Sequence, residues 1–471
     1  MRLGRTAVVH FVSRVGASLA GFVATFVIAR ELGPEPLGVY TIGVGLLYVT
    51  SIPLNAVTTA VSKRMSEGSE QGTYLSAGAL MIGAITVVVA AVILGLRGVV
   101  ESYVGADVAL LLAALVAGQA LYATVQAVLT GERRVEVTGV SEVVERVVRT
   151  ALQIGFIVAG YSVAGLFLGY VGSLFVAAAL TVVVVRTRPR RPTRAQFASL
   201  WRFAKHSWFG PLKARSFGWM DTIVLALFVA PGLIGVYEVA WTLSNVVALL
   251  GGSIRRVLFP EMSNLSTGDD FERIRHFLDE AFVYTGVLAI PGLFGAVAIG
   301  DRVLAIYRPT FSQGATVLGL LIVAQIASMF GDQLLSAIDA VDRPDVTFRI
   351  NGLFVVLNLV LNVVLVWTIG WVGAAIATVL STTIVLIASF VAVDRIVGRP
   401  PIPVRELGRE VVAALVMAAA VAAIEPSVPT GHYLTVALVL LGASVYGLVL
   451  LSLSARIRQK VRYVLPDTWA A

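Results

Sequence analysis

The sequence predicts an all-α membrane protein with fourteen transmembrane helices: two lobes of six helices each, followed by a C-terminal pair. Three observations lead to this prediction. The chain of 471 residues is 58% hydrophobic and only 14% charged, with a mean hydropathy of +0.88, which is far from the composition of soluble domains. Its apolar segments are long enough to cross about 30 Å of hydrocarbon. Finally, a short motif occurs twice, 197 residues apart.

The apolar segments must be helical, because lipid offers no hydrogen-bond partners to an open backbone. The first segment is too long for the core of a signal peptide and runs into ARELGP rather than a cleavage site of small residues. We expect spans at residues 8–29, 37–61, 73–96, 107–130, 137–159, 163–185, 206–229, 234–256, 281–300, 314–338, 346–368, 371–393, 409–424 and 433–454.

The repeated motif follows the first span as ARELGPEPLGVY (29–40) and the seventh as ALFVAPGLIGVY (226–237). Proline, glycine and tyrosine keep one constant offset: Pro34, Gly38 and Tyr40 correspond to Pro231, Gly235 and Tyr237. Duplication of a multi-helix membrane unit is typical of transporters with two lobes around a central path. Because the two lobes have equal numbers of spans in the same orientation, the repeat is predicted to be parallel, with its axis along the membrane normal.

Two basic, proline-containing stretches divide the chain, at 186–194 and 398–410. We therefore expect an N-lobe at 1–195 (helices 1–6), a C-lobe at 196–397 (helices 7–12), and a third part at 398–471 with helices 13–14 and a basic cytoplasmic tail. The sixth and twelfth spans both open with a turn and then a glycine, Gly165 and Gly373. Such glycines, with Gly169 and Gly172, indicate close helix packing in lipid.

The distribution of basic residues predicts the orientation. Of the 36 Lys and Arg residues, four lie in the predicted outer loops and five within spans, which leaves 27 on the inner side. By the positive-inside rule both termini are cytoplasmic. The net charge of +8 therefore reflects topology, and no nucleic-acid partner is expected.

Composition also excludes several classes of site. The chain has no cysteine and four histidines, none spaced as a metal-binding pair, so neither a thiolate nor a zinc site is expected. Every outer loop is short, with no domain that could perform glycan chemistry. We therefore predict that the protein is not an enzyme and has no cofactor, apart from a coupling ion (H⁺ or Na⁺) for which Asp332 and Asp339 are candidates.

Polar side chains inside the spans point to the site, since each costs about 2.5–3.5 kcal/mol at mid-helix. The first span carries one polar, small face, and the second a comparable stripe below a kink expected at Pro53. These residues are Arg14, Ser18, Gly21 and Thr25, then Asn55, Thr59 and Ser62. Arg14 either lines a cavity or extends to the cytoplasmic interface.

The seventh and eighth spans, which the duplication matches to the first and second, also carry polar stripes. Their members are Lys213, Arg215 and Asp221, then Glu238, Thr242, Asn245, Gly252 and Arg256. Four such stripes predict a water-filled cavity whose basic inner half suits a phosphate or pyrophosphate. Two alternatives stay open: Asp221 could pair with Lys213 or cap a helix, and Glu238 could be solvated near the outer surface.

Three further patterns have mainly structural interpretations. In the fifth span, Glu142 and Glu145 precede Arg146 and Arg149 at i,i+4 spacing. This predicts a neutralised charged face on a cytoplasmic helix extension or, alternatively, part of a cytoplasmic mouth for a lipid head group. Asn358 and Asn362 in the eleventh span indicate hydrogen bonds between helices. Residues 268–280 predict an interfacial amphipathic helix with Phe271, Ile274 and either Phe277 or Leu278 toward lipid.

The motif ARELGPEPLGVY, the segment MDTIVLALFVAPGLIGVYEVAWTLSN (220–245) with its Asp221, and VLFPEMS (257–263) resemble polysaccharide-biosynthesis flippases of the Wzx type. The resemblance covers about the first 395 residues. This family belongs to a superfamily, called MOP, with MurJ-like lipid II flippases and MATE cation antiporters. The resemblance implies a V-shaped two-lobed fold, alternating access, and a cavity lined largely by spans one, two, seven and eight.

These observations together predict a flippase in the prokaryotic cytoplasmic membrane. Its substrate would be an oligosaccharide on a polyprenyl phosphate or pyrophosphate, used for surface polysaccharide, such as O-antigen, or for glycoprotein glycans. The alternative is a MATE-like ion-coupled antiporter of organic cations. Expected partners are the glycolipid, the bilayer and glycan-assembly enzymes, and the protein is expected to be a monomer. The predicted substrate-binding residues are Arg14, Asn55, Lys213, Arg215, Asp221, Glu238, Asn245 and Arg256.

Overall fold

Over residues 21–207, 212–248, 259, 261–264 and 270–464, which the structure describes, the computed structural model is helical throughout, without strands. Nine helices in these ranges are long and apolar enough to cross a membrane, or ten when the bent pair α2–α3 counts as one span. The predicted multi-pass, all-α architecture is confirmed. The count of fourteen spans stays a prediction.

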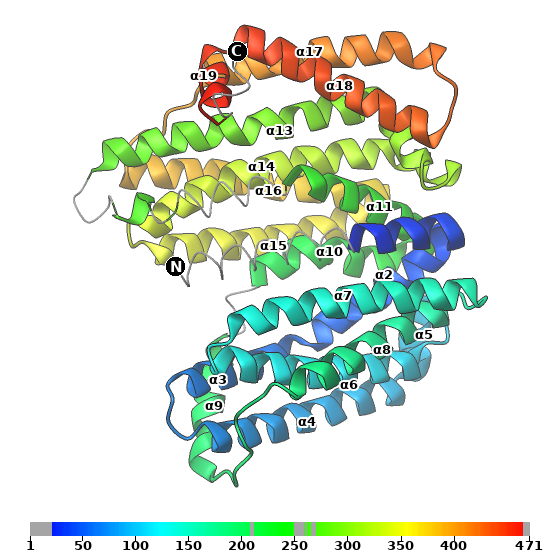
Figure 1. Ribbon diagram of the computed structural model, residues 1–471, viewed down its shortest axis with the longest axis vertical. Helices are drawn as coiled ribbons and strands as arrows, with labels where there is room; N and C mark the ends of the chain where they lie inside the picture. The colour runs from blue at the N-terminus through cyan, green and yellow to red at the C-terminus, as the bar shows by residue number, and fades with distance from the viewer. Residues whose placement is uncertain (1–20, 208–211, 249–258, 260, 265–269, 465–471) are drawn as a thin grey trace. The chain divides into compact units, whose positions relative to one another are not determined.

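The chain divides into two compact units, Met1–Gly235 and Val236–Ala471. The first contains a helical segment at 21–32 and the labelled helices of Figure 1 up to α10. Their bounds are α2 Pro34–Thr50, α3 Ile52–Ser66, α4 Gln71–Gly95, α5 Arg97–Val104, α6 Ala109–Gly131, α7 Val135–Val158, α8 Val163–Val182, α9 Arg194–Ser207 and α10 Leu212–Phe228. Within this unit α4, α6, α8 and α7 pack in a row, with α3 against α4 and α6.

Glycines set the distance between α7 and α8. A Cβ on Gly165 would lie 2.8 Å from the Cβ of Phe156, and one on Gly169 would lie 2.9 Å from the backbone nitrogen of Gln153. Helices approach this closely only where one of them has no side chain. The predicted packing role of these glycines is confirmed.

The second span is broken where proline predicted a kink. α2 and α3 meet at Ser51 with a bend of 51°, and Pro53 occupies the first turn of α3, where its missing N–H costs nothing. The Asn55 side-chain amide donates to the carbonyl of Ser51 at 2.8 Å. The same carbonyl also accepts the backbone N–H of Asn55 at 2.9 Å.

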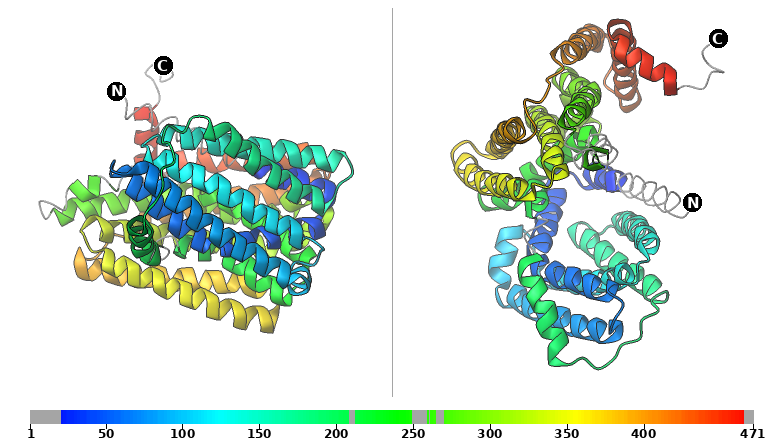
Figure 2. Two further views of the ribbon diagram at one scale, coloured as in Figure 1. Left: turned by 90° about the horizontal axis from the view of Figure 1, so that it is seen from below. Right: turned by 90° about the vertical axis from the view of Figure 1, so that its left-hand side faces the viewer.

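α11 crosses the boundary between the units, and the remaining elements belong to the second. The bounds are α11 Pro231–Ala248, α13 Phe271–Ala305, η1 Pro309–Gly314, α14 Ala315–Ala340, α15 Pro344–Ile369, α16 Trp371–Ile396, α17 Val404–Ile424, η2 Glu425–Ser427, α18 His432–Leu453 and α19 Ala455–Val464. Within this unit α13, α14, α16 and α15 follow one another as neighbours, and α17 and α18 pack on α13. In the right-hand view of Figure 2, α17 and α18 lie beside α13 within the second unit.

The predicted interfacial helix at 268–280 is wrong as a separate, lipid-facing element. Asp270 caps α13 by accepting from the backbone N–H of Arg273 at 3.2 Å, and the helix then continues to Ala305. Ile274 and Leu278 are fully buried in protein. The helical period was correct, but neighbouring helices, rather than lipid, cover the apolar stripe.

Large apolar side chains elsewhere stay exposed along α4, α15 and α18, as at Val87, Val356 and Leu440. Such surface suits hydrocarbon rather than water. The lobe boundaries predicted near residues 195 and 397 stay predictions.

Candidate functional site

α10 carries part of the predicted site and is held within the first unit. The Trp219 ring stacks on Tyr48 of α2, with centroids 4.5 Å apart, and Gly45 leaves room for Trp219. From α5, the Tyr103 hydroxyl donates to the carbonyl of Ile223 at 2.9 Å. Burial raises the pKa of Tyr103 to about 12, so the phenol remains a donor near neutral pH. In this helix Asp221 is buried and Lys213 half-buried.

The two copies of the sequence motif meet where α2 and α11 begin. A Cβ on Gly38 would lie 1.8 Å from the carbonyl oxygen of Pro231, and one on Gly235 would lie 1.9 Å from that of Pro34. All four residues belong to the first unit. The contact is reciprocal, as a local twofold relation requires. The repeated glycines therefore allow the two backbones to pack in direct contact.

Other predicted residues have partners within their own unit. In α11 Asn245 accepts a hydrogen bond of 2.8 Å from the Gln325 amide of α14. The half-buried Glu238 accepts from Thr242 at 3.4 Å. Asn55 bonds to its own helix, as described above. Arg14 and Arg256 lie outside the described residues, as does the side chain of Arg215.

The structure thus places Asn55, Lys213 and Asp221 in the first unit, and Glu238 and Asn245 in the second. It brings α10 against α2. The predicted assembly of these residues into one binding site stays a prediction.

Sequence reasoning misjudged the charged part of α7. Glu145 and Arg149 do form the predicted pair, with the carboxylate accepting from Nε at 2.9 Å and from Nη2 at 2.5 Å. Glu145 is, however, buried near the helix centre, where Ser173 donates to it at 2.9 Å. The guanidinium lies 3.8 Å from the ring centroid of Tyr170. The predicted neutralised pair is therefore confirmed, but it is packed between α7 and α8 rather than on an exposed charged face, and the polar residues of α8 were the signal that could have revealed this.

An arginine just after the predicted ninth span is buried in the second unit. Arg302, near the end of α13, is 7% exposed. It pairs with Glu425 at 3.0 Å and donates to the carbonyl of Val428 at 2.9 Å and the hydroxyl of Thr435 at 3.2 Å. It therefore ties α13 to the connection between α17 and α18.

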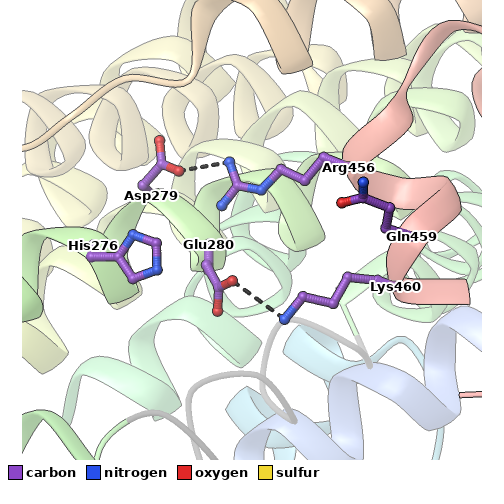
Figure 3. Close-up of a pocket in the computed structure, with 6 residues that line it drawn as sticks. All are labelled: His276, Asp279, Glu280, Arg456, Gln459 and Lys460. Atoms are coloured by element: carbon purple, nitrogen blue, oxygen red, sulfur yellow. Dashed lines mark hydrogen bonds and ion pairs between the residues drawn. The ribbon is translucent and has the colours of Figure 1, made fainter. Parts of the chain in front are cut away.

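The pocket in Figure 3 lies between α13 and α19. His276, Asp279 and Glu280 line it from α13, and Arg456, Gln459 and Lys460 from α19. Its carboxylates are already paired: Arg456 with Asp279 at 2.7 Å and Lys460 with Glu280 at 3.4 Å. These pairs dock the C-terminal amphipathic helix. Within the described ranges no group of three or more His, Cys, Asp or Glu residues could hold a metal.

Comparison with known families decides the class. Residues 69–307 match the family described as polysaccharide biosynthesis protein. The chain is 33% identical to a protein of Haloferax volcanii named "Probable flippase AglR", covering 99% of both chains. The chain belongs to this family. It is also 27% identical, over 81% of both chains, to the "Probable low-salt glycan biosynthesis flippase Agl15" of the same organism.

Solved structures agree on the fold of this family member. A lipid II flippase MurJ in an inward closed conformation matches with a TM-score of 0.79, covering 94% of this chain and 98% of that one at 13% identity. An inward-facing MATE multidrug transporter of the MOP superfamily matches with a TM-score of 0.67, covering 81% and 94% at 14% identity. The predicted resemblance to Wzx-type flippases is confirmed: this is a membrane flippase, a transporter rather than an enzyme.

Proposed function

We propose that this flippase moves an oligosaccharide linked to polyprenyl phosphate or pyrophosphate from the cytoplasmic to the outer leaflet by alternating access. The main support for the proposal is the sequence similarity to a protein named as a probable flippase, which extends over 99% of the chain. That coverage includes the C-terminal helices α17 and α18, which pack on α13 within the second unit. The predicted product is a surface polysaccharide or a glycoprotein glycan.

The substrate phosphate would be bound by the basic residues of the predicted cavity: Arg14, Lys213, Arg215 and Arg256. Arginine grips a phosphate through two parallel hydrogen bonds and lysine as a point charge. Asn55 and Asn245 would meet the sugars, and Asp221 and Glu238 would complete the polar lining. The half-buried position of Lys213 on α10 supports this assignment, because burial strengthens its attraction for an anion.

The lipid tail would stay in the bilayer while the two lobes rock about the head group, eased by Pro53, Pro211 and Pro291. The protein would act as a monomer in the cytoplasmic membrane with both termini inside, driven by a coupling ion or by downhill flux and served by glycan-assembly enzymes. The 27 basic residues on the predicted inner side support this orientation.

Reconstitution tests the proposal. Purified protein in proteoliposomes should protect a fluorescent polyprenyl-linked oligosaccharide from an external quencher, and should not move ethidium under a proton or sodium gradient. Ethidium efflux without glycolipid movement would establish an organic-cation antiporter instead. The buried Asp221 would then be the first residue to change.

The double variant Lys213→Ala/Arg215→Ala should lose glycolipid translocation more than about 100-fold, since each charged hydrogen bond contributes about 1.5–3 kcal/mol. A matched control, Arg191→Ala/Arg202→Ala, removes two exposed positive charges outside the predicted spans and should keep wild-type transport. Retained transport in the first variant would remove both residues from the mechanism.

A further inference from the structure

Arg146 lies at the middle of a helix that must cross the membrane. α7 has 24 residues, and Arg146 has roughly 16–18 Å of helix on either side at 1.5 Å per residue. Its neighbours α6 and α8 are both apolar enough to span. The connections 132–134 and 159–162 are too short to cross a bilayer, so α7 must return the chain across it. At this depth an arginine is too far from the interface to extend to it.

Arg146 is one of the two charged residues near the middle of α7, with Glu142, for which no ion pair forms among the described residues. Glu145 and Arg149 neutralise each other, as shown above. Arg146 is exposed, and within the described ranges no carboxylate lies within ion-pair distance of its guanidinium. The pair with Glu142 that the i,i+4 spacing predicts does not form, and Glu142 is exposed as well. A guanidinium at this depth that is not bonded to a carboxylate requires water or an anionic ligand.

The face of α7 that carries Arg146 is not its apolar face. Three exposed apolar residues, Val140, Val147 and Val158, form one stripe, and Arg146 lies about 100° around the helix from Val147. Val135, which begins the helix, is the exposed apolar residue on the side of Arg146. Its Nη1 atom lies 3.1 Å from the position that a Cβ on Gly21 would take. Arg146 therefore faces the first helix, on the side where sequence predicts small and polar residues, and Gly21 leaves space for the guanidinium.

We propose that Arg146 lines the water-accessible substrate path and binds the phosphate or pyrophosphate of the transported glycolipid at mid-membrane depth. The assignment rests on the proposed function and adds a residue of the fifth span to it. A guanidinium offers the planar donor pair that phosphate oxygens accept.

The absence of cysteine from the chain permits a test of position that does not depend on transport. Arg146→Cys and Val147→Cys lie at the same depth on different faces. The membrane-impermeant thiol reagent methanethiosulfonate ethylsulfonate should label the Arg146→Cys variant in proteoliposomes and leave Val147→Cys unlabelled. Equal labelling of the two variants, or labelling of Val147→Cys alone, would overturn the assignment.

Binding of polyprenyl pyrophosphate to the detergent-purified protein, followed by tryptophan fluorescence, tests the ligand. Arg146→Gln should weaken binding about 10- to 100-fold, the effect of one charged hydrogen bond, and Arg146→Lys should restore part of it. Glu142→Gln removes the neighbouring charge and should bind as wild type. If the double variant Glu142→Gln/Arg146→Gln regained binding, Arg146 would serve only to neutralise Glu142, and the assignment would be wrong.

The two proposals fail differently. If the wild-type protein does not bind polyprenyl pyrophosphate, the proposed function itself is contradicted. If wild type and Arg146→Gln bind it equally, only the assignment of Arg146 is contradicted.

Discussion

The two units bury charge in different ways. In the first, Glu145 and Arg149 are one turn apart on the same helix and form a closed pair with Ser173. In the second, Arg302 reaches from α13 to partners more than 120 residues away, most of them oxygens of the connection between α17 and α18. The first arrangement stabilises a helix position, whereas the second joins separate elements. The exposed Arg146 has neither kind of partner among the described residues.

The largest effect on stability is expected from breaking the ion pair between Glu145 and Arg149 in the first unit. Arg149→Leu would leave the buried Glu145 carboxylate with Ser173 as its hydrogen-bond donor. The free energy of unfolding should fall by about 3–5 kcal/mol, as for other buried pairs that lose one partner. The measurement is denaturant unfolding in mixed micelles.

The double variant Glu145→Leu/Arg149→Leu should recover most of this loss, because no uncompensated charge remains. A double variant as unstable as the single one would show that the pair contributes more than it costs to bury, and the comparison with the second unit would need revision.

A somewhat smaller effect is expected at Arg302. Arg302→Met keeps much of the buried volume but removes the donors to Glu425, Val428 and Thr435. The free energy of unfolding should fall by about 2–3 kcal/mol, since the buried Thr435 hydroxyl and the half-buried oxygens of Glu425 and Val428 lose their donor. Limited proteolysis should cut first in the connection 425–431 between α17 and α18. Cleavage confined to other loops would show that Arg302 does not hold this connection.

The smallest effect concerns a feature that both units share. Gly165→Ala places a Cβ 2.7 Å from that of Tyr161, and Gly373→Ala places one 2.2 Å from the Leu365 carbonyl oxygen. Each should lower the free energy of unfolding by about 1–3 kcal/mol, as overpacking does, and Gly373 should be the more sensitive because its neighbour is backbone.

Matched controls exist in both units. Gly83→Ala and Gly352→Ala meet nothing within 4 Å and should cause no loss of stability. Equal losses at all four positions would mean that the glycines matter through helix flexibility rather than through packing.

Much of the fold could be predicted because the bilayer restricts the possibilities. Long apolar segments can only be helices in lipid, Pro53 marked the α2–α3 bend, and the repeated motif marked the glycines Gly38 and Gly235, which prove to be in contact. The assembly of the site stays a prediction. Asn55 and Asn245 were chosen as polar residues on helices, and the structure adds that each bonds to protein, one to the Ser51 carbonyl and one to Gln325.

The sequence by itself determined the class of this protein: span-length hydrophobicity, charge asymmetry and internal duplication are local or statistical properties that need no packing to be recognised. Only the tertiary structure decided which of the charged side chains form ion pairs. Spacing proposes both Glu142–Arg146 and Glu145–Arg149 as pairs, yet only the second forms. The reason is that Ser173 and Tyr170 of α8 surround the second pair, whereas Arg146 faces a glycine on the first helix.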